Sequence, residues 1–253
     1  MLIRTFLLAT AVLASTNALA VCKDQNPNWL WNYQGTIDDK YLVRMTLVLG
    51  GQLVTGRYFY VSQLRDIQIK GTIIDEREIV LDELDAEGNV TARFEGKFED
   101  RDPKGSFNGS QLACEVIDGF WQQKGSTKRL PVYLRMESGT PGKLGGRYAS
   151  IDADEKDIHE KAFKFWSAVK RGDRKTVATM IEYPVQVNVP GGRSELRSAK
   201  ELLANYDDIF TPRFRESIAN AVPKNMFFRD QGIMLGNGEV WFRPNGKVFS
   251  LNN

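Results

Sequence analysis

Hydrophobic and polar residues alternate along most of the chain between residues 29 and 137. Residues 41–49 (YLVRMTLVL) show this period of two, and two glycines follow them, which is a strong hairpin signal. Short strands at such regular spacing predict an antiparallel all-β barrel or sandwich, which we place at residues 21–137. Further runs of the same period lie at residues 31–37, 53–61, 67–73, 79–84, 90–98, 114–122 and 130–136, with a weak one near Phe107.

Residues 152–253 combine helical and strand patterns and predict a second, α+β domain. A capping box at Asp152 and Glu155 is expected to open a helix that ends at Gly172. Further helices are expected after Asp173, after Ser198 and from Pro212. Strands are expected at residues 185–189, 194–197, 227–235, 239–243 and 247–252.

The two domains are separated in the sequence by residues 138–151. This segment is rich in Gly, Ser and Pro, a composition typical of linkers. We therefore predict a two-domain chain with a linker at residues 138–151.

Four segments of the C-terminal domain carry a family resemblance. They are KAFKFWSAVKRGDRKTVATMI, YPVQVN, ANYDDIFTP and QGIMLGNGEVWFRPNGKVFSLNN. Together they resemble the nuclear-transport-factor-2-like superfamily, which implies a cone-shaped α+β fold whose mouth often binds something small and apolar. The residues that would line or rim this cone are Trp166, Tyr183, Tyr206, Asn237, Glu239 and Trp241.

Aromatic residues at such spacing also suit a packed core. Trp166 shares a helical face with Ile158, Ala162 and Val169, so we expect it to fill the space between the first helix and the sheet. Trp241 and Phe242 point to opposite faces of one strand, so only one of them can face the cone. The N-terminal domain distantly resembles a calycin-type barrel, through its strand number and the sequence Gly-Phe-Trp at residues 119–121.

The first twenty residues have the pattern of a secretory signal peptide. Arg4 precedes an apolar run at residues 6–14, and Ala18 and Ala20 frame a small-x-small cleavage site. The run is too short to span a bilayer, and no later segment is long and apolar enough, although an uncleaved N-terminal anchor is the alternative. We expect cleavage after Ala20 and a soluble protein in the periplasm of a Gram-negative bacterium, with no integral membrane segment.

Cys22 and Cys114 are the two cysteines of the chain, and in an oxidising compartment we expect them to form a disulfide. With one histidine and no clustered ligands, no metal site is expected, and no phosphate loop or other cofactor motif is present. The balance of 34 Lys and Arg against 32 Asp and Glu argues against nucleic acid as a partner.

Three functions remain open on the sequence alone. The first is a non-enzymatic binding protein for a protein partner in the envelope, such as an inhibitor or immunity protein, with strand addition to an unclosed N-terminal sheet as one mode. The second is a carrier of a small lipophilic ligand inside the barrel or the cone. The third is a cone-fold isomerase, dehydratase or hydrolase, which needs a carboxylate with a raised pKa inside the cone. His159 is expected to be solvated and to take no part in catalysis.

Overall fold

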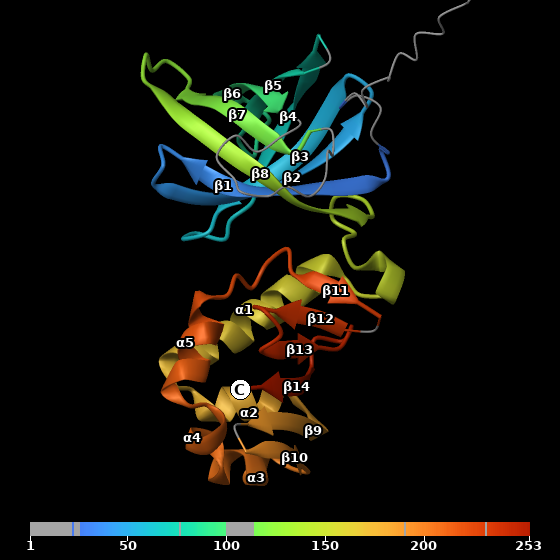
Figure 1. Ribbon diagram of the computed structural model, residues 1–253, viewed down its shortest axis with the longest axis vertical. Helices are drawn as coiled ribbons and strands as arrows, with labels where there is room; N and C mark the ends of the chain where they lie inside the picture. The colour runs from blue at the N-terminus through green and yellow to red at the C-terminus, as the bar shows by residue number, and fades with distance from the viewer. Residues whose placement is uncertain (1–21, 23–25, 76, 100–113, 190, 231) are drawn as a thin grey trace, which may run out of the picture.

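The computed structural model describes residues 22, 26–75, 77–99, 114–189, 191–230 and 232–253. It contains a β-barrel and an α+β domain, with helix α1 and strand β11 at the end of the second domain nearest the barrel (Figure 1). The expected signal peptide at residues 1–20 and the weak strand near Phe107 lie outside the described residues.

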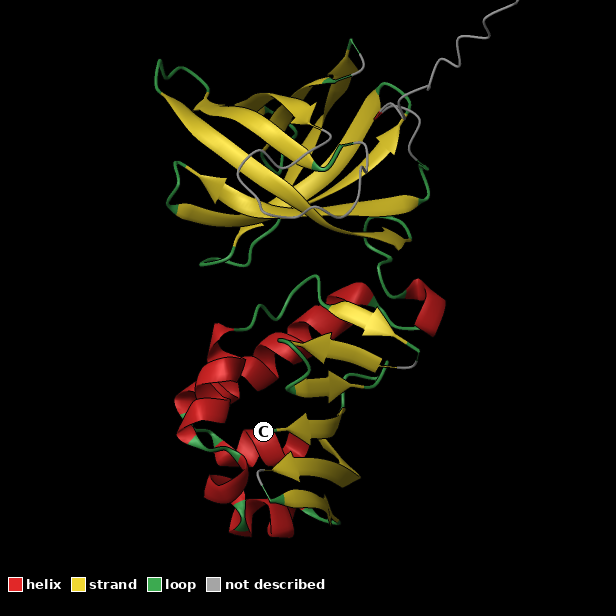
Figure 2. Cartoon of the chain, viewed as in Figure 1, coloured by secondary structure: helices red, strands yellow, loops and turns green. Residues whose placement is uncertain are grey.

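Eight antiparallel strands close the N-terminal domain into a barrel (Figure 2). Each strand pairs with the next, and the last pairs with the first, so the described barrel offers no edge for strand addition. The prediction of an antiparallel β domain is confirmed, and the barrel form is the correct one. The strands are β1 (Trp29–Ile37), β2 (Tyr41–Gly50), β3 (Leu53–Tyr60), β4 (Ile67–Ile74), β5 (Glu78–Leu84), β6 (Val90–Glu99), β7 (Val116–Gln123) and β8 (Arg129–Pro141).

The alternation along each strand separates the barrel interior from its outer face. In β2, Val43, Met45 and Leu47 are buried in the barrel core, so Arg44 and Thr46 project outward. The same alternation in the neighbouring strands fills the interior with apolar side chains. The barrel interior is therefore a packed core.

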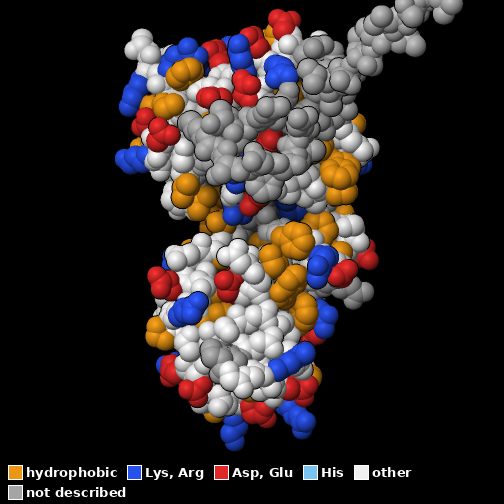
Figure 3. All heavy atoms as spheres, in the orientation of Figure 1, with side chains coloured by type: hydrophobic (Ala, Val, Ile, Leu, Met, Phe, Trp, Pro, Cys, Tyr) orange, Lys and Arg blue, Asp and Glu red, His pale blue; other side chains and the backbone are white. Residues whose placement is uncertain are grey.

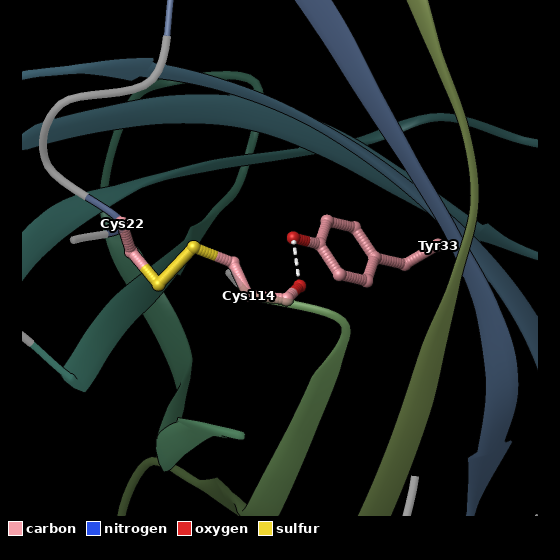
Figure 4. Close-up of a disulfide and its surroundings, with 3 residues drawn as sticks. All are labelled: Cys22, Tyr33 and Cys114. Carbon is pink, nitrogen blue, oxygen red and sulfur yellow. Dashed lines mark hydrogen bonds between the residues drawn. A yellow bond between two sulfur atoms is a disulfide. The ribbon is translucent and has the colours of Figure 1, made fainter. Parts of the chain in front are cut away.

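The disulfide between Cys22 and Cys114 joins residues 92 positions apart. Both cysteines are buried in the barrel core, and the Tyr33 hydroxyl of β1 donates a hydrogen bond of 2.9 Å to the carbonyl oxygen of Cys114 (Figure 4). The predicted pairing is confirmed. It attaches the chain at Cys22 to the residues just before β7.

A six-stranded mixed sheet forms the second domain, with helices packed against one face (Figure 2). The strand order is β10-β9-β14-β13-β12-β11, and only the β14–β9 pairing is parallel among the described strands. The strands are β9 (Ile181–Val189), β10 (Gly192–Leu196), β11 (Phe227–Arg229), β12 (Gly232–Leu235), β13 (Val240–Phe242) and β14 (Val248–Asn252). The helices are α1 (Glu155–Arg171), α2 (Arg174–Met180), α3 (Ala199–Ala204), α4 (Tyr206–Ile209) and α5 (Pro212–Asn220).

Most of the predicted helix ends are confirmed. Gly172 ends α1 with a left-handed φ of 68°, and Asp173 and Ser198 accept the capping hydrogen bonds of α2 and α3. The predicted capping box at Asp152 and Glu155 is wrong, because Asp154 is the residue that caps α1. The expected strand at residues 227–235 is also wrong, since the chain turns after β11 and returns as β12.

The segment expected to be a linker packs between the domains. Strand β8 continues to Pro141, a 3-10 turn (η2) follows at Ala149–Ile151, and Arg147 and Tyr148 between them are buried. The Gly-rich composition of residues 138–151 predicted a solvated connection. It did not reveal that two long side chains would be enclosed there.

Phe165, rather than Trp166, fills the space between α1 and the sheet. Phe165 is fully buried, and its ring meets that of Phe242 edge to face, with the ring centroids 5.6 Å apart. Trp166 is only partly buried and lies beside α5, where its Nε1 donates to the carbonyl oxygen of Ala219 at 3.2 Å. The prediction for Trp166 is wrong because it lies about 100° around the helix from Phe165.

Candidate functional site

A row of polar residues on the outside of the barrel meets the second domain. Asn32 of β1 pairs in register with Thr46 of β2, which pairs with Arg57 of β3. All three alternate with core residues and project outward. Asn32 and Thr46 nevertheless have exposed fractions of only 7% and 0%, because the second domain covers them.

Arg147 forms the centre of this contact, and only 3% of its surface is exposed. Its Nη2 donates to Asn32 Oδ1 at 2.5 Å and to Thr46 Oγ1 at 3.1 Å. Asn225 Nδ2 donates to the same Thr46 oxygen at 3.2 Å. The amide of Asn32 and the hydroxyl of Thr46 thus hold one nitrogen of the guanidinium in place.

Among the described residues, no carboxylate forms an ion pair or a side-chain hydrogen bond with Arg147. Glu155 accepts a hydrogen bond from the backbone N–H of Arg147, not from its side chain. Arg147 Nε and Asn225 Oδ1 are buried without a hydrogen-bond partner in the described part of the chain. Burial lowers the pKa of Arg147 to about 10. Tyr148 and Glu137 act in the opposite direction, nearby Arg57 and Arg44 act in the same direction as burial, and the group stays charged at neutral pH.

A second cluster beside Arg147 is electrically balanced. Arg57 pairs with Glu155 and, at 3.8 Å, with Asp66, and Lys224 pairs with Asp66 at 2.9 Å. Two cations therefore face two carboxylates. This cluster joins the barrel to α1 and to the chain before β11, and its charges are satisfied without a ligand.

His159 belongs to the same interface, so the expectation that it is solvated is wrong. Its Nε2 accepts a hydrogen bond of 3.1 Å from the backbone N–H of Asn225 and lies 3.2 Å from the Tyr148 hydroxyl oxygen. Burial, followed by the positive charges of Lys224, Arg57 and Arg147, lowers its pKa from 6.5 to about 3. The imidazole is therefore neutral and acts as an acceptor.

This lowered pKa predicts a loss of stability in acid. The unfolded chain takes up a proton on His159 as the pH falls through about 6.5, whereas the folded chain does so only near pH 3. We expect the free energy of unfolding of the native chain, relative to His159→Gln, to fall by about 2.6 kcal/mol between pH 7.5 and pH 4.5. Urea unfolding of both proteins at a series of pH values measures this difference, and a difference independent of pH would contradict the assignment.

A cleft of about 1000 Å³ opens beside Arg147, between the two domains. Its floor is polar and consists of Asn32, Thr46, Arg147 and Asn225. The second domain lines the cleft with an apolar wall and also with the polar residues Ser217, Asn220, Asn237 and Glu239. Figure 3 shows hydrophobic side chains gathered on this part of the domain, next to the barrel. This volume lies at the upper end of the range of about 300–1,000 Å³ for small-molecule sites. The apolar wall residues are Met226, Phe227, Phe228 and Met234, from β11, β12 and the chain just before β11.

The charged residues at the edge of the cleft have both signs. Arg44 and Glu239 are partly buried, and Glu137 is exposed. Glu239 also accepts a hydrogen bond from the backbone N–H of Asn237. The buried floor is positive, while the two carboxylates lie nearer to solvent.

The structure places two of the six predicted site residues in this cleft and leaves four outside it. Asn237 and Glu239, at the turn between β12 and β13, line the cleft. The other four residues, Trp166, Tyr183, Tyr206 and Trp241, do not line it.

Those four residues pack within the second domain. The Tyr183 hydroxyl donates a hydrogen bond of 3.1 Å to the carbonyl oxygen of Ala178. The fully buried Tyr206 stacks on Phe210. Trp241 lies on the face of β13 opposite to the buried Phe242.

Sequence reasoning missed Asn32, Thr46, Arg147 and Asn225. Asn32 and Thr46 occupy outward strand positions that the alternation marks as solvated. Arg147 lies in a segment with linker composition. These residues are buried where the two domains meet, and the local pattern of hydrophobic and polar residues does not predict which surfaces meet.

Comparisons with protein-family models, with curated proteins and with solved structures found no match to this chain. In the described part of the chain, no helix is long and apolar enough to cross a membrane.

Proposed function

We propose that this chain is an exported, non-enzymatic binding protein of the Gram-negative periplasm that holds a small ligand between its two domains. The observation that carries the proposal is the interdomain cleft of about 1000 Å³, with polar groups at its floor and apolar side chains on its wall. A concave, largely apolar site with a few convergent polar groups is the usual form of a ligand site. It takes up the small-ligand function that the sequence left open and places the ligand between the domains instead of inside the barrel or the cone.

Export is supported by two independent features. The first twenty residues have the three-part pattern of a signal peptide. The disulfide between Cys22 and Cys114 suits an oxidising compartment such as the periplasm. Membership of the second domain in the nuclear-transport-factor-2-like superfamily is part of the proposal, and the mixed sheet with helices against one face supports it.

Binding is favoured over catalysis by the partners of the titratable groups. Glu155 is the one buried carboxylate among the described residues, and its oxygens are bonded to Arg57 and to the backbone N–H of Arg147. His159 is neutral and already accepts a backbone hydrogen bond. The described part of the chain also contains no group of three residues able to hold a metal ion.

A protein partner is the second candidate. The six-stranded sheet has β10 and β11 at its two edges, and Phe227 of β11 has an exposed fraction of 54%. An open edge with an exposed aromatic side chain suits strand addition by a partner. Recovery of a stoichiometric protein with the chain from periplasm would favour this candidate.

The test of the ligand site is native mass spectrometry of the mature protein purified from periplasm. We expect a small-molecule adduct on the native chain and on Glu216→Trp, and its loss on Ser217→Trp. Ser217 of α5 lines the cleft, whereas its neighbour Glu216 is exposed outside it. The control thus adds the same ring one residue away. Equal adducts on both variants, or none on any of the three proteins, would contradict the proposal.

A further inference from the structure

We propose that the ligand of this cleft is an anionic amphiphile, with a carboxylate or phosphate head on Arg147 and an apolar body along β11 and β12. This inference depends on the proposed function, because it names the ligand class of the same cleft. Three features of the cleft indicate this ligand class: a buried guanidinium without an ion-pair partner among the described residues, the fixed orientation of that group, and the apolar side chains of the wall.

The first feature is that Arg147 has no ion-pair partner among the described residues. Buried arginines are almost always paired, because an uncompensated charge away from water is costly. Here the neighbouring cluster has two cations and two carboxylates, while Arg147 contacts only the neutral side chains of Asn32 and Thr46 among the described residues. The charge of Glu137 acts on Arg147 from an exposed position without contacting it, so an anion that enters the cleft would supply a direct partner for the guanidinium.

The second feature is the orientation of the guanidinium. Asn32 Nδ2 donates to the carbonyl oxygen of Leu30 at 3.1 Å and to Ser138 Oγ at 3.2 Å, so its Oδ1 is turned toward Arg147. Thr46 Oγ1 donates to Asn32 Oδ1 at 3.0 Å and accepts from Arg147 and Asn225. Both partners are fully used and rigidly placed.

These bonds engage only Nη2. The Nε of Arg147 has no partner within the described residues, and no hydrogen bond from Nη1 to them is seen. A planar guanidinium fixed at one nitrogen, with donors to spare on the others, suits a carboxylate or phosphate oxygen.

The third feature is the separation of chemistry across the cleft. Arg44, partly buried at the edge of the cleft, projects from β2 on the same face as Thr46 and adds a second positive charge to the lining. Glu137 and Glu239 lie nearer to solvent and repel an anion there, so the head group is favoured at the floor. The aromatic and methionine side chains of the wall offer an apolar surface to the rest of the molecule.

The test is isothermal titration of the mature protein, freed of bound small molecules, with decanoate, decyl phosphate, 1-decanol and acetate below their micelle concentrations. We expect decanoate or decyl phosphate to bind at least tenfold more tightly than both 1-decanol and acetate. Decanol lacks the charge, and acetate lacks the apolar body. Binding of only one of the two head groups supports the proposal and identifies the oxyanion.

Two variants test the role of Arg147. Arg147→Gln removes the charge, and Asn225→Asp places a carboxylate on the Thr46 hydroxyl that Arg147 also contacts. We expect each to weaken decanoate or decyl phosphate at least tenfold and to leave 1-decanol unchanged. Asn225→Asp keeps the side-chain volume, so the test stands if Arg147→Gln does not fold. Arg129→Gln, an exposed arginine outside the cleft, is the matched control for net charge and should bind as the native chain does.

Three results would overturn the inference. Equal binding of 1-decanol and the anionic probes would show that the cleft binds a ligand but does not require an anionic head group. Unchanged anion binding in folded Asn225→Asp would show that Arg147 only fastens the domains. Failure of every probe, together with no adduct on the native chain, would overturn the proposed function as well.

Discussion

Replacing Cys22 and Cys114 together with alanine is expected to lower the free energy of unfolding of the barrel by about 4 kcal/mol. The bond joins residues 92 positions apart, and a crosslink around a loop of about 100 residues restricts the unfolded chain by up to ~4.7 kcal/mol at 25 °C. Alanine is used because a serine hydroxyl at these buried positions would need a partner. Urea unfolding of the oxidised native protein and of the double variant measures the change.

Reduction provides the control for this prediction. A thiol reductant should bring the native protein close to the stability of the double variant and should leave that variant unaffected. The prediction is contradicted if both the double substitution and the reduction lower the free energy of unfolding by less than about 1 kcal/mol, because the disulfide then contributes little to the stability of the barrel.

The barrel was predictable because its information is local. Along β2, inward and outward residues alternate without interruption from Val43 to Leu49, and each inward residue of the series is in the core. Hairpin signals such as Gly50-Gly51 then connect consecutive strands. Closure follows from the pairing of β1 with β8, a contact between strands about a hundred residues apart, which the pattern leaves open between barrel and sandwich.

The start of α1 shows where local rules end. Asp152 and Glu155 have the spacing of a capping box, but Asp154 caps the helix and Glu155 pairs with Arg57 of the barrel. A long-range ion pair thus takes a side chain that a local motif would have used. Gly172, Asp173 and Ser198 were predicted correctly because their capping partners lie within a few residues.

The site could not be predicted for the same reason. Asn32, Thr46, Arg147 and Asn225 come from four separate parts of the chain, and each looks solvated or unstructured in its own neighbourhood. Asn237 and Glu239 were proposed as the rim of a cone, yet the structure places them on the cleft between the domains. The residue types were informative, but the surface they line is created by docking.

The effects of Phe165→Ala and Trp166→Ala should separate the core of the second domain from its edge. Phe165 is fully buried against Phe242, so its truncation should lower the free energy of unfolding by about 3–5 kcal/mol. Trp166 is partly buried, and its ring lies tilted against that of Phe163, with Lys170 over its face. Its indole N–H donates one hydrogen bond to the carbonyl oxygen of Ala219. Its truncation should cost about 1–2 kcal/mol, less than that of Phe165, because part of the ring remains in contact with solvent.

Urea unfolding of the two variants and the native chain gives both values under one set of conditions. Phe163→Ala is the control, because Phe163 has an exposed fraction of 48%. Its truncation should change the free energy of unfolding by less than the truncation of Phe165 or Trp166. If Trp166→Ala lowers the free energy of unfolding by as much as Phe165→Ala or more, Trp166 fills the space between α1 and the sheet after all. The expected order, Phe165 above Trp166 above Phe163, follows directly from how far each ring faces the sheet.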